Sequence, residues 1–195
     1  MADHDQYYEY LQRRSLLGII YRRYWVFPRL ARHLRGLTVD VGCGVGDMLR
    51  VRPGTIGVDI NPRLVEYCRG LGLDARPMQP DALPFPDSTV DSVLLDNVIE
   101  HIVDPAPLVG EIRRILKPEG IFLVGIPGLR GWHSDPDHKV LYDQHNLRKR
   151  VEALGLVHQR TFFAPLIESD WMSRNLRQYF IYCLFVRPQG PAIPS

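Results

Sequence analysis

The chain has 195 residues, of which 45% are hydrophobic and 24% are charged. This length is enough to close one hydrophobic core, and the composition excludes a disordered, collagen-like or low-complexity chain. Lys and Arg number 24 and Asp and Glu number 22, so the net charge of +2 gives no sign of nucleic acid as an obligate partner. The basic residues are unevenly placed, because the first 35 residues hold seven arginines against three acidic side chains.

The cysteines and the apolar runs of the sequence indicate the cellular compartment of the protein. Cys43, Cys68 and Cys183 form no CxxC pair, which is typical of reduced thiols in a reducing environment. No apolar run approaches the length of a bilayer span, and the N-terminus begins with acidic and Tyr-rich sequence in place of a signal-like apolar region. The sequence therefore predicts a cytoplasmic protein.

Strand and helix patterns alternate along the chain. A helix is expected over 5–35, and strands are expected at 37–41, 55–60, 73–77, 90–96, 120–126, 156–164 and 179–187. Further helices are expected at 47–51, after the Asn-Pro and Asp-Pro pairs at 61–62 and 104–105, and at 144–154. The almost wholly apolar run 120–126 predicts a strand buried on both faces. Alternation that ends in two strands predicts an α/β doubly wound sheet with an antiparallel edge.

The domain boundaries follow from the same pattern. We expect one domain over 1–195, with a helical extension at 1–35, a core at 36–187 and a Pro- and Gly-rich tail at 188–195.

A glycine-rich turn follows the first predicted strand. Gly42, Gly44 and Gly46 stand at the strand-to-helix junction, where missing Cβ atoms let the backbone turn tightly and a ligand approach closely. Asp59 ends the second predicted strand, beside that turn in a doubly wound sheet, where a carboxylate accepts ribose hydroxyl protons. The sequence therefore predicts a nucleoside site at this edge of the sheet.

The spacing of the glycines and the charge around the turn indicate which class of ligand the turn binds. The glycines follow GxGxG spacing, which counts against a dinucleotide, for which GxGxxG is typical. Asp40 and Asp47 flank the turn with negative charge, which favours a cationic ligand over a pyrophosphate.

Five ordered segments carry a resemblance to a known family. They are 39–46 (VDVGCGVG), Asp59 within 57–60 (GVDI), 81–91 (DALPFPDSTVD), 95–101 (LDNVIEH) and 116–124 (LKPEGIFLV). Over roughly 38–164 the chain resembles a class I S-adenosylmethionine-dependent methyltransferase of the small-molecule, ubiquinone-biosynthesis-like branch (methyltransferase type 11/23).

The resemblance implies a fold, a cofactor and its contacts. The fold would be a Rossmann-like, mostly parallel seven-stranded sheet of order 3-2-1-4-5-7-6 with strand 7 antiparallel, and the cofactor S-adenosyl-L-methionine. The implied cofactor-binding residues are Asp40, Gly42, Gly44, Gly46, Asp59, Ile60, Asp81, Ala82 and Asn97. Among them, Asp59 would hold the ribose, Ile60 would pack on adenine, and Asp81 with the Ala82 N–H would meet the adenine edge.

The sequence defines the binding site of the methyl acceptor less closely than that of the cofactor. His101 follows the fourth strand at the edge of the sheet where ligands bind, and is the expected catalytic residue. The long segment 128–143 is expected to bind the acceptor through Trp132, His133, His138 and Tyr142. Some relatives bind a divalent metal through a Glu-x-x-Glu-His segment, but Asn97 replaces the first acid here, so no metal is expected.

The expected activity is methyl transfer to an O or N atom of a small molecule. The alternatives are a nicotinamide-dependent oxidoreductase on a similar sheet and a non-catalytic cofactor-binding domain. The basic N-terminal helix is expected to cover the cofactor as a lid, with an arginine on the ligand carboxylate. Its aromatic residues Tyr24, Trp25 and Phe27 also allow peripheral membrane contact, which would suit a lipid-like acceptor.

Overall fold

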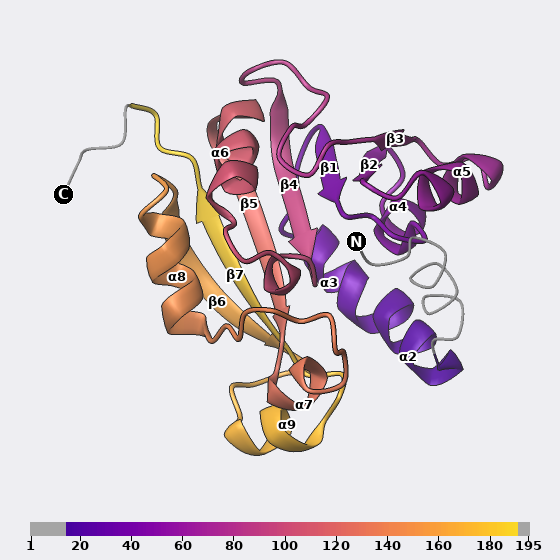
Figure 1. Cartoon of the computed structure of the whole chain (residues 1–195), viewed down its shortest axis with the longest axis vertical. Coiled ribbons are helices and arrows are strands. Elements are labelled where there is room, and N and C mark those ends of the chain that lie inside the picture. Colours follow the sequence, from indigo (N-terminus) through magenta and orange to yellow (C-terminus); the bar gives the residue numbers. More distant parts are fainter. Residues whose placement is uncertain (1–14, 191–195) are drawn as a thin grey trace.

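The computed structural model describes residues 15–190. One sheet runs through the molecule, with strands β1 Thr38–Val41, β2 Thr55–Asp59, β3 Ala75–Pro77, β4 Val90–Asp96, β5 Leu116–Pro127, β6 Val157–Ala164 and β7 Phe180–Val186. Its order is β3-β2-β1-β4-β5-β7-β6, and β7 pairs antiparallel with both β5 and β6 (Figure 1). The expected fold class and strand order are therefore confirmed.

Alternate residues of the central strands supply two separate hydrophobic clusters. On β4, Val93 and Leu95 join one cluster while Leu94 joins the other, as the alternation of side chains along a strand requires. The first cluster includes residues of α6 Ala106–Ile115 and α8 Gln144–Glu152, and the second includes residues of α3 Phe27–Ala31 and α4 Asp47–Val51. Helices on both sides explain why the central strands are apolar on both faces.

Helix starts are set by local chemistry. Asn61 caps α5 Pro62–Gly70 by accepting from the Arg63 N–H, with Pro62 at the first helical position. Asp143 caps α8 and forms a capping box with Asn146.

The N-terminal helix lies across the carboxyl ends of the central strands. It comprises α2 Leu16–Tyr21, the π-helical turn η1 Arg22–Val26 and α3 (Figure 1). Val26, Phe27 and Leu30 are buried in the second cluster, whereas Leu16 and Leu17 are exposed. The part of the expected helix before residue 15 and the tail after 190 lie outside the described residues.

Two short helices were not expected from the sequence. α7 Leu129–Trp132 follows β5, and α9 Asp170–Asn175 lies in the connection between β6 and β7. α9 buries none of its residues, so its sequence carries no apolar stripe that could reveal it. β5 also begins at Leu116, because Leu116 pairs with Val90 ahead of the main register. Within residues 15–190, we find no helix with the length and hydropathy that crossing a bilayer requires.

Candidate functional site

The glycine turn after β1 closes on the neighbouring strand. The N–H groups of Gly42 and Cys43 donate to the Val58 carbonyl at 2.8 and 3.1 Å. Gly42 has φ +73°, and a Cβ there would lie 2.5 Å from Val98 Cγ2. A side chain at this position would therefore both strain the backbone and displace Val98.

Asp59 connects the end of β2 to this turn. Its carboxylate accepts from the Gly44 N–H through Oδ2 and from the Asn61 N–H through Oδ1, each at 2.9 Å. An ionised carboxylate has about four acceptor sites, so this one side chain can accept from both N–H groups at once. The structure thus places the predicted ribose-binding acid directly against the predicted turn.

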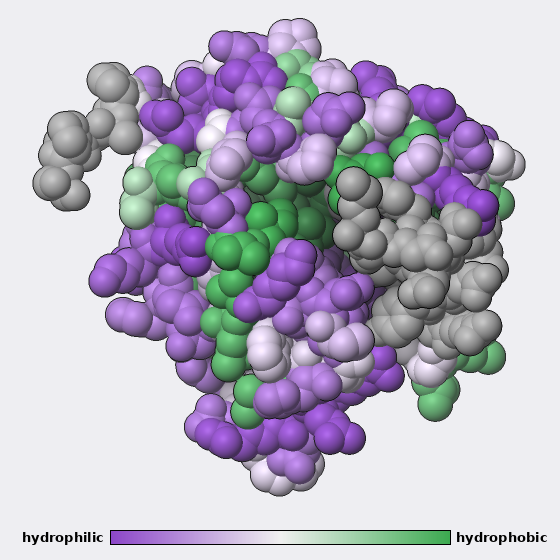
Figure 2. All heavy atoms as spheres, in the orientation of Figure 1, coloured by the Kyte–Doolittle hydropathy of each residue, from purple (hydrophilic) through white to green (hydrophobic). Residues whose placement is uncertain are grey.

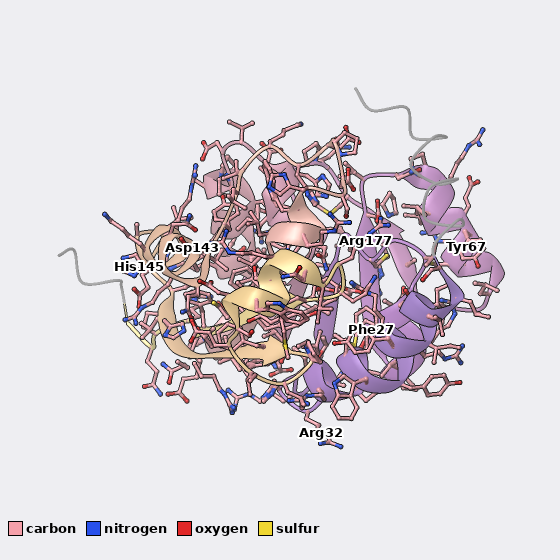
Figure 3. The ribbon with its side chains drawn as sticks, turned by 90° about the horizontal axis from the view of Figure 1, so that it is seen from below. Phe27, Arg32, Tyr67, Asp143, His145 and Arg177 are labelled. Carbon is pink, nitrogen blue, oxygen red and sulfur yellow. The ribbon has the colours of Figure 1, made fainter. Side chains whose placement is uncertain are left out.

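A cavity of about 420 Å³ opens at the carboxyl ends of β1 and β4. It is lined by the glycine turn, the N-terminal helix, the end of β4 and the segment after β5; the lining includes Arg22, Phe27, Asp40, Gly42, Gly44, Asp47, Asp96, Asn97, His101, Asp135, His138 and Arg177. Seen from below, Phe27 lies on the N-terminal helix and Arg177 on the segment after α9 (Figure 3). The helix therefore forms one side of the cavity, as a lid would.

An ion pair joins the N-terminal helix to the end of β4. The Arg22 guanidinium donates to Asp96 Oδ2, and it lies 4.9 Å from the centre of the Phe27 ring and 5.1 Å from that of Phe180. Burial alone would lower the pKa of Arg22, but the adjacent Asp96 carboxylate outweighs it and the pKa is raised. The arginine is thus held charged inside the cavity.

Asp40 lies beside this pair and is 5% exposed. Burial, reinforced by the carboxylates of Asp96 and Asp59, raises the pKa of Asp40 well above its usual range. Sequence reasoning selected Asp40 but missed Arg22 and Asp96. Asp96 stood inside the quoted 95–101 segment, and Arg22 was one of seven arginines that the sequence could not separate.

A second group, which we call the histidine cluster, consists of Glu100, His101 and His138. Glu100 and His101 belong to the 3₁₀ turn η2 Ile99–His101 after β4, and His138 follows α7. The two imidazole rings are 4.6 Å apart between centroids, and His138 Nε2 is 3.7 Å from Glu100 Oε1. Burial raises the pKa of Glu100 to about 8, and burial also lowers the pKa of His101.

The remaining predicted cofactor residues lie outside the lining of the 420 Å³ cavity. Ile60 is 52% exposed at the end of β2. Asp81 and Ala82 lie exposed in the loop after β3, where the Ala82 N–H donates to the Gln79 carbonyl at 3.4 Å. A Cβ on Gly46 would meet Leu73 at 2.7 Å, so Gly46 shapes the turn against the core. The adenine contacts stay predictions.

The structure brings one of the four predicted acceptor residues, His138, into the cavity. Trp132 instead supports His138 from behind, stacked at 6.2 Å with its indole N–H donating to the Val140 carbonyl. His133 is exposed and contacts Trp132 edge-on. Tyr142 lines a separate cavity of about 450 Å³ beside the start of α8 and α9.

A doubly wound sheet with a glycine turn, a carboxylate at the end of β2 and an adjoining cavity defines a nucleoside-binding α/β protein. Comparison with known proteins agrees. A methyltransferase domain family matches residues 39–124. A probable S-adenosylmethionine-dependent methyltransferase of Mycolicibacterium smegmatis is 36% identical over 127 residues, which are 58% of this chain and 49% of that protein.

Two further relatives extend the comparison. A ubiquinone biosynthesis O-methyltransferase of Cereibacter sphaeroides is 33% identical over 95 residues, covering 44% of this chain and 38% of that protein. The structure of an S-adenosylmethionine-dependent methyltransferase from Thermotoga maritima, described as a possible histamine N-methyltransferase, has a TM-score of 0.76 and 18% identity. That match covers 94% of this chain and 97% of the other, and shows the shared fold.

These matches support a class I S-adenosylmethionine-dependent methyltransferase with S-adenosylmethionine as its cofactor. The aligned segments amount to half or less of the length of the curated relatives described above.

Proposed function

We propose that this protein transfers a methyl group from S-adenosylmethionine to an oxygen or nitrogen atom of a small molecule. The observation that carries the proposal is the continuity of one cavity from the glycine turn to the histidine cluster. It gives a methyl donor and an acceptor adjacent places, and the relatives named as O- and possible N-methyltransferases are consistent with either acceptor atom.

The residues around the turn fit this cofactor. Gly42 lets the turn pack against Val98 at the edge of the cavity, and the Asp59 carboxylate holds the turn against the end of β2, where it would meet the ribose. Arg22 and Asp96 present opposite charges in the same cavity, which match the carboxylate and ammonium groups of an amino-acid end. When bound, S-adenosylmethionine supplies a methyl group already activated by its positively charged sulfur.

The protein has to align the methyl donor with the acceptor and to remove a proton from the acceptor. The N-terminal helix covers one side of the cavity, and can exclude water and hold the reacting groups in line. His101 donates from Nδ1 to the Asp137 carbonyl at 3.3 Å if that nitrogen carries the proton, and this leaves Nε2 with a lone pair. Burial lowers the pKa of His101, which favours the neutral ring near pH 7. We place the acceptor beside this ring and His138.

Replacing His101 with alanine is expected to lower kcat by at least about tenfold while leaving cofactor affinity within about twofold, because the ring lies on the acceptor side. Transfer of labelled methyl groups to a panel of phenols and amines, with calorimetry for the cofactor, measures both. His145→Ala, an exposed histidine outside the cavity, is the control. Equal kcat values for the two variants would contradict the assignment. A panel with no methylated product, together with tight NADH binding, would favour an oxidoreductase.

We also propose that the outer face of the N-terminal helix, over α2 and η1, contacts an anionic membrane surface, which would bring a lipid-like acceptor to the cavity. Leu16, Leu17 and Tyr24 are 71%, 80% and 70% exposed. Figure 2 shows hydrophobic side chains protruding at the place of α2, at the lower right, apart from the larger hydrophobic area near the middle of the same face. Residues 15–39 contain five arginines and no acidic residue, so the charge suits anionic headgroups.

Leu17→Glu is expected to reduce co-sedimentation with phosphatidylglycerol vesicles several-fold, because it places a carboxylate on the apolar face. Val103→Glu, at a site 66% exposed on another part of the surface, should bind as the unmodified protein does. Equal loss in both variants would show a general charge effect, and no binding of the unmodified protein would contradict the membrane contact.

A further inference from the structure

The side chains of the histidine cluster have no role in the cofactor contacts described above. Glu100 is fully buried, and neither of its carboxylate oxygens has a hydrogen-bond partner. A buried polar group without a partner costs about 1–3 kcal/mol or more, so such groups are rarely left unmatched. Protonation of Glu100 would not remove this cost, because the hydroxyl and carbonyl oxygens of the neutral acid would still lack hydrogen-bond partners.

Both histidines have Nδ1 beside a backbone carbonyl, and His138 Nε2 faces Glu100 Oε1 at 3.7 Å. His138 Nδ1 lies 2.7 Å from the Trp132 carbonyl, and His101 Nδ1 lies 3.3 Å from the Asp137 carbonyl. A carbonyl only accepts, so each Nδ1 is the protonated nitrogen and each Nε2 carries a lone pair. Metal-bound histidines are typically held in this way, with the second nitrogen donating to a backbone carbonyl.

Backbone contacts hold the two contributing segments together. The Lys139 and Val140 N–H groups donate to the Glu100 carbonyl at 2.8 and 3.0 Å. One ligating atom from each of Glu100, His101 and His138 lies within 4.8 Å of the others. A cation with bonds of about 2.0–2.2 Å places its ligands about 3.3 Å apart, so closing the site takes shifts of about 1.5 Å at most, within reach of side-chain rotation.

We infer that Glu100, His101 and His138 bind a divalent transition-metal ion of the Zn²⁺ type at the acceptor side of the cavity. Two imidazole nitrogens and one carboxylate suit Zn²⁺ and its neighbours in the first row, whereas Mg²⁺ and Ca²⁺ prefer oxygen ligands. This departs from the expectation, drawn from the sequence, that the chain holds no metal. His101 and His138 both line the cavity, so the ion's open positions would face the acceptor.

This role deepens the proposed function, since it specifies the acceptor as a molecule with a metal-binding oxygen or nitrogen. An acceptor hydroxyl bound to the ion loses its proton more readily, because the cation stabilises the resulting anion. His101 then acts on the acceptor as a ligand of the ion, and the expected loss of kcat in His101→Ala is unchanged.

The test uses tag-free, chelator-treated full-length protein titrated with ZnCl₂ by calorimetry and with CoCl₂ by absorption spectroscopy. We expect one equivalent of Zn²⁺ to bind, and Co²⁺ to give d–d bands that Zn²⁺ removes. His138→Ala and Glu100→Gln should each weaken Zn²⁺ binding by at least about tenfold. His133→Ala, an exposed histidine of the same loop, is the matched control and should bind as the unmodified protein does.

Circular dichroism and cofactor affinity report whether the variants fold. Zn²⁺ binding that is equal in His138→Ala, His133→Ala and the unmodified protein would overturn the site, as would no binding at all. Zn²⁺ binding with no methyl transfer to any acceptor would leave the metal site standing and refute the proposed function. If chelation does not affect methyl transfer and no Zn²⁺ binds, the metal site is refuted and the proposed methyltransferase function stands.

Discussion

Replacing Asp59 with alanine is expected to weaken S-adenosylmethionine binding by at least tenfold. Hydrogen bonds to a charged group contribute about 1.5–3 kcal/mol, and about 1.4 kcal/mol corresponds to a factor of ten in affinity. The substitution also removes the acceptor of the Gly44 N–H, at 2.9 Å, so the glycine turn loses the contact that connects it to β2. Calorimetry with S-adenosylmethionine and with its demethylated product measures the effect.

Two further variants test whether the loss of affinity comes from the ribose contact or from disturbance of the glycine turn. Asp59→Asn keeps an oxygen for the Gly44 N–H but removes the charge, so its affinity should fall between those of the alanine variant and the unmodified protein. Asp74→Ala removes an exposed aspartate that pairs with Arg76 and should leave affinity unchanged. If Asp59→Ala binds the cofactor as tightly as Asp74→Ala does, Asp59 has no ribose role.

Replacing Arg22 with methionine is expected to lower the free energy of unfolding by about 3 kcal/mol near pH 7, because removing one partner of a buried ion pair leaves the other charge uncompensated. The side chains of Arg22 and Asp96 are 17% and 5% exposed, and Asp40 adds a second carboxyl group beside them. Urea unfolding followed by circular dichroism measures the change. Cofactor affinity should also fall, since the guanidinium lies in the cavity.

The pH dependence of this loss has a defined sign. The pKa of Asp40 is raised by burial, and Arg22 partly opposes that rise. A carboxyl group whose pKa is higher in the folded state than in the unfolded state destabilises the fold increasingly as pH rises above the unfolded pKa. Without Arg22 the pKa of Asp40 rises further, so the deficit should shrink as pH falls from 7 towards about 4.

Arg23→Met is the matched control for this experiment, because Arg23 is the exposed neighbour on the same helical turn. It should unfold within about 0.5 kcal/mol of the unmodified protein, as surface substitutions usually do. Equal stability of the Arg22 and Arg23 variants would show that the ion pair with Asp96 contributes nothing to the fold.

The difference between prediction and structure is clearest in the segment 128–143. Its length and its aromatic and histidine content indicated a binding element, and four of its residues were chosen by type. The structure brings His138 into the cavity, uses Trp132 to support it, and leaves His133 exposed. Residue type in a loop gives no direction for a side chain, because no periodicity fixes which way it points.

The sequence by itself determined the alternation of strands and helices, the glycine turn and the acid at the end of β2, whereas the expected strand order came from the resemblance to the methyltransferase family. These features depend on neighbours in sequence: apolar periodicity, Pro and Asn at helix starts, and glycine where only glycine tolerates the backbone. Only the tertiary structure decided that Arg22 pairs with Asp96 and that His138 joins Glu100 and His101. Arg22 and Asp96 are 74 positions apart in the sequence, and Glu100 and His138 are 38 positions apart. The free energy of these contacts depends on burial and distance, which exist only once the chain has folded.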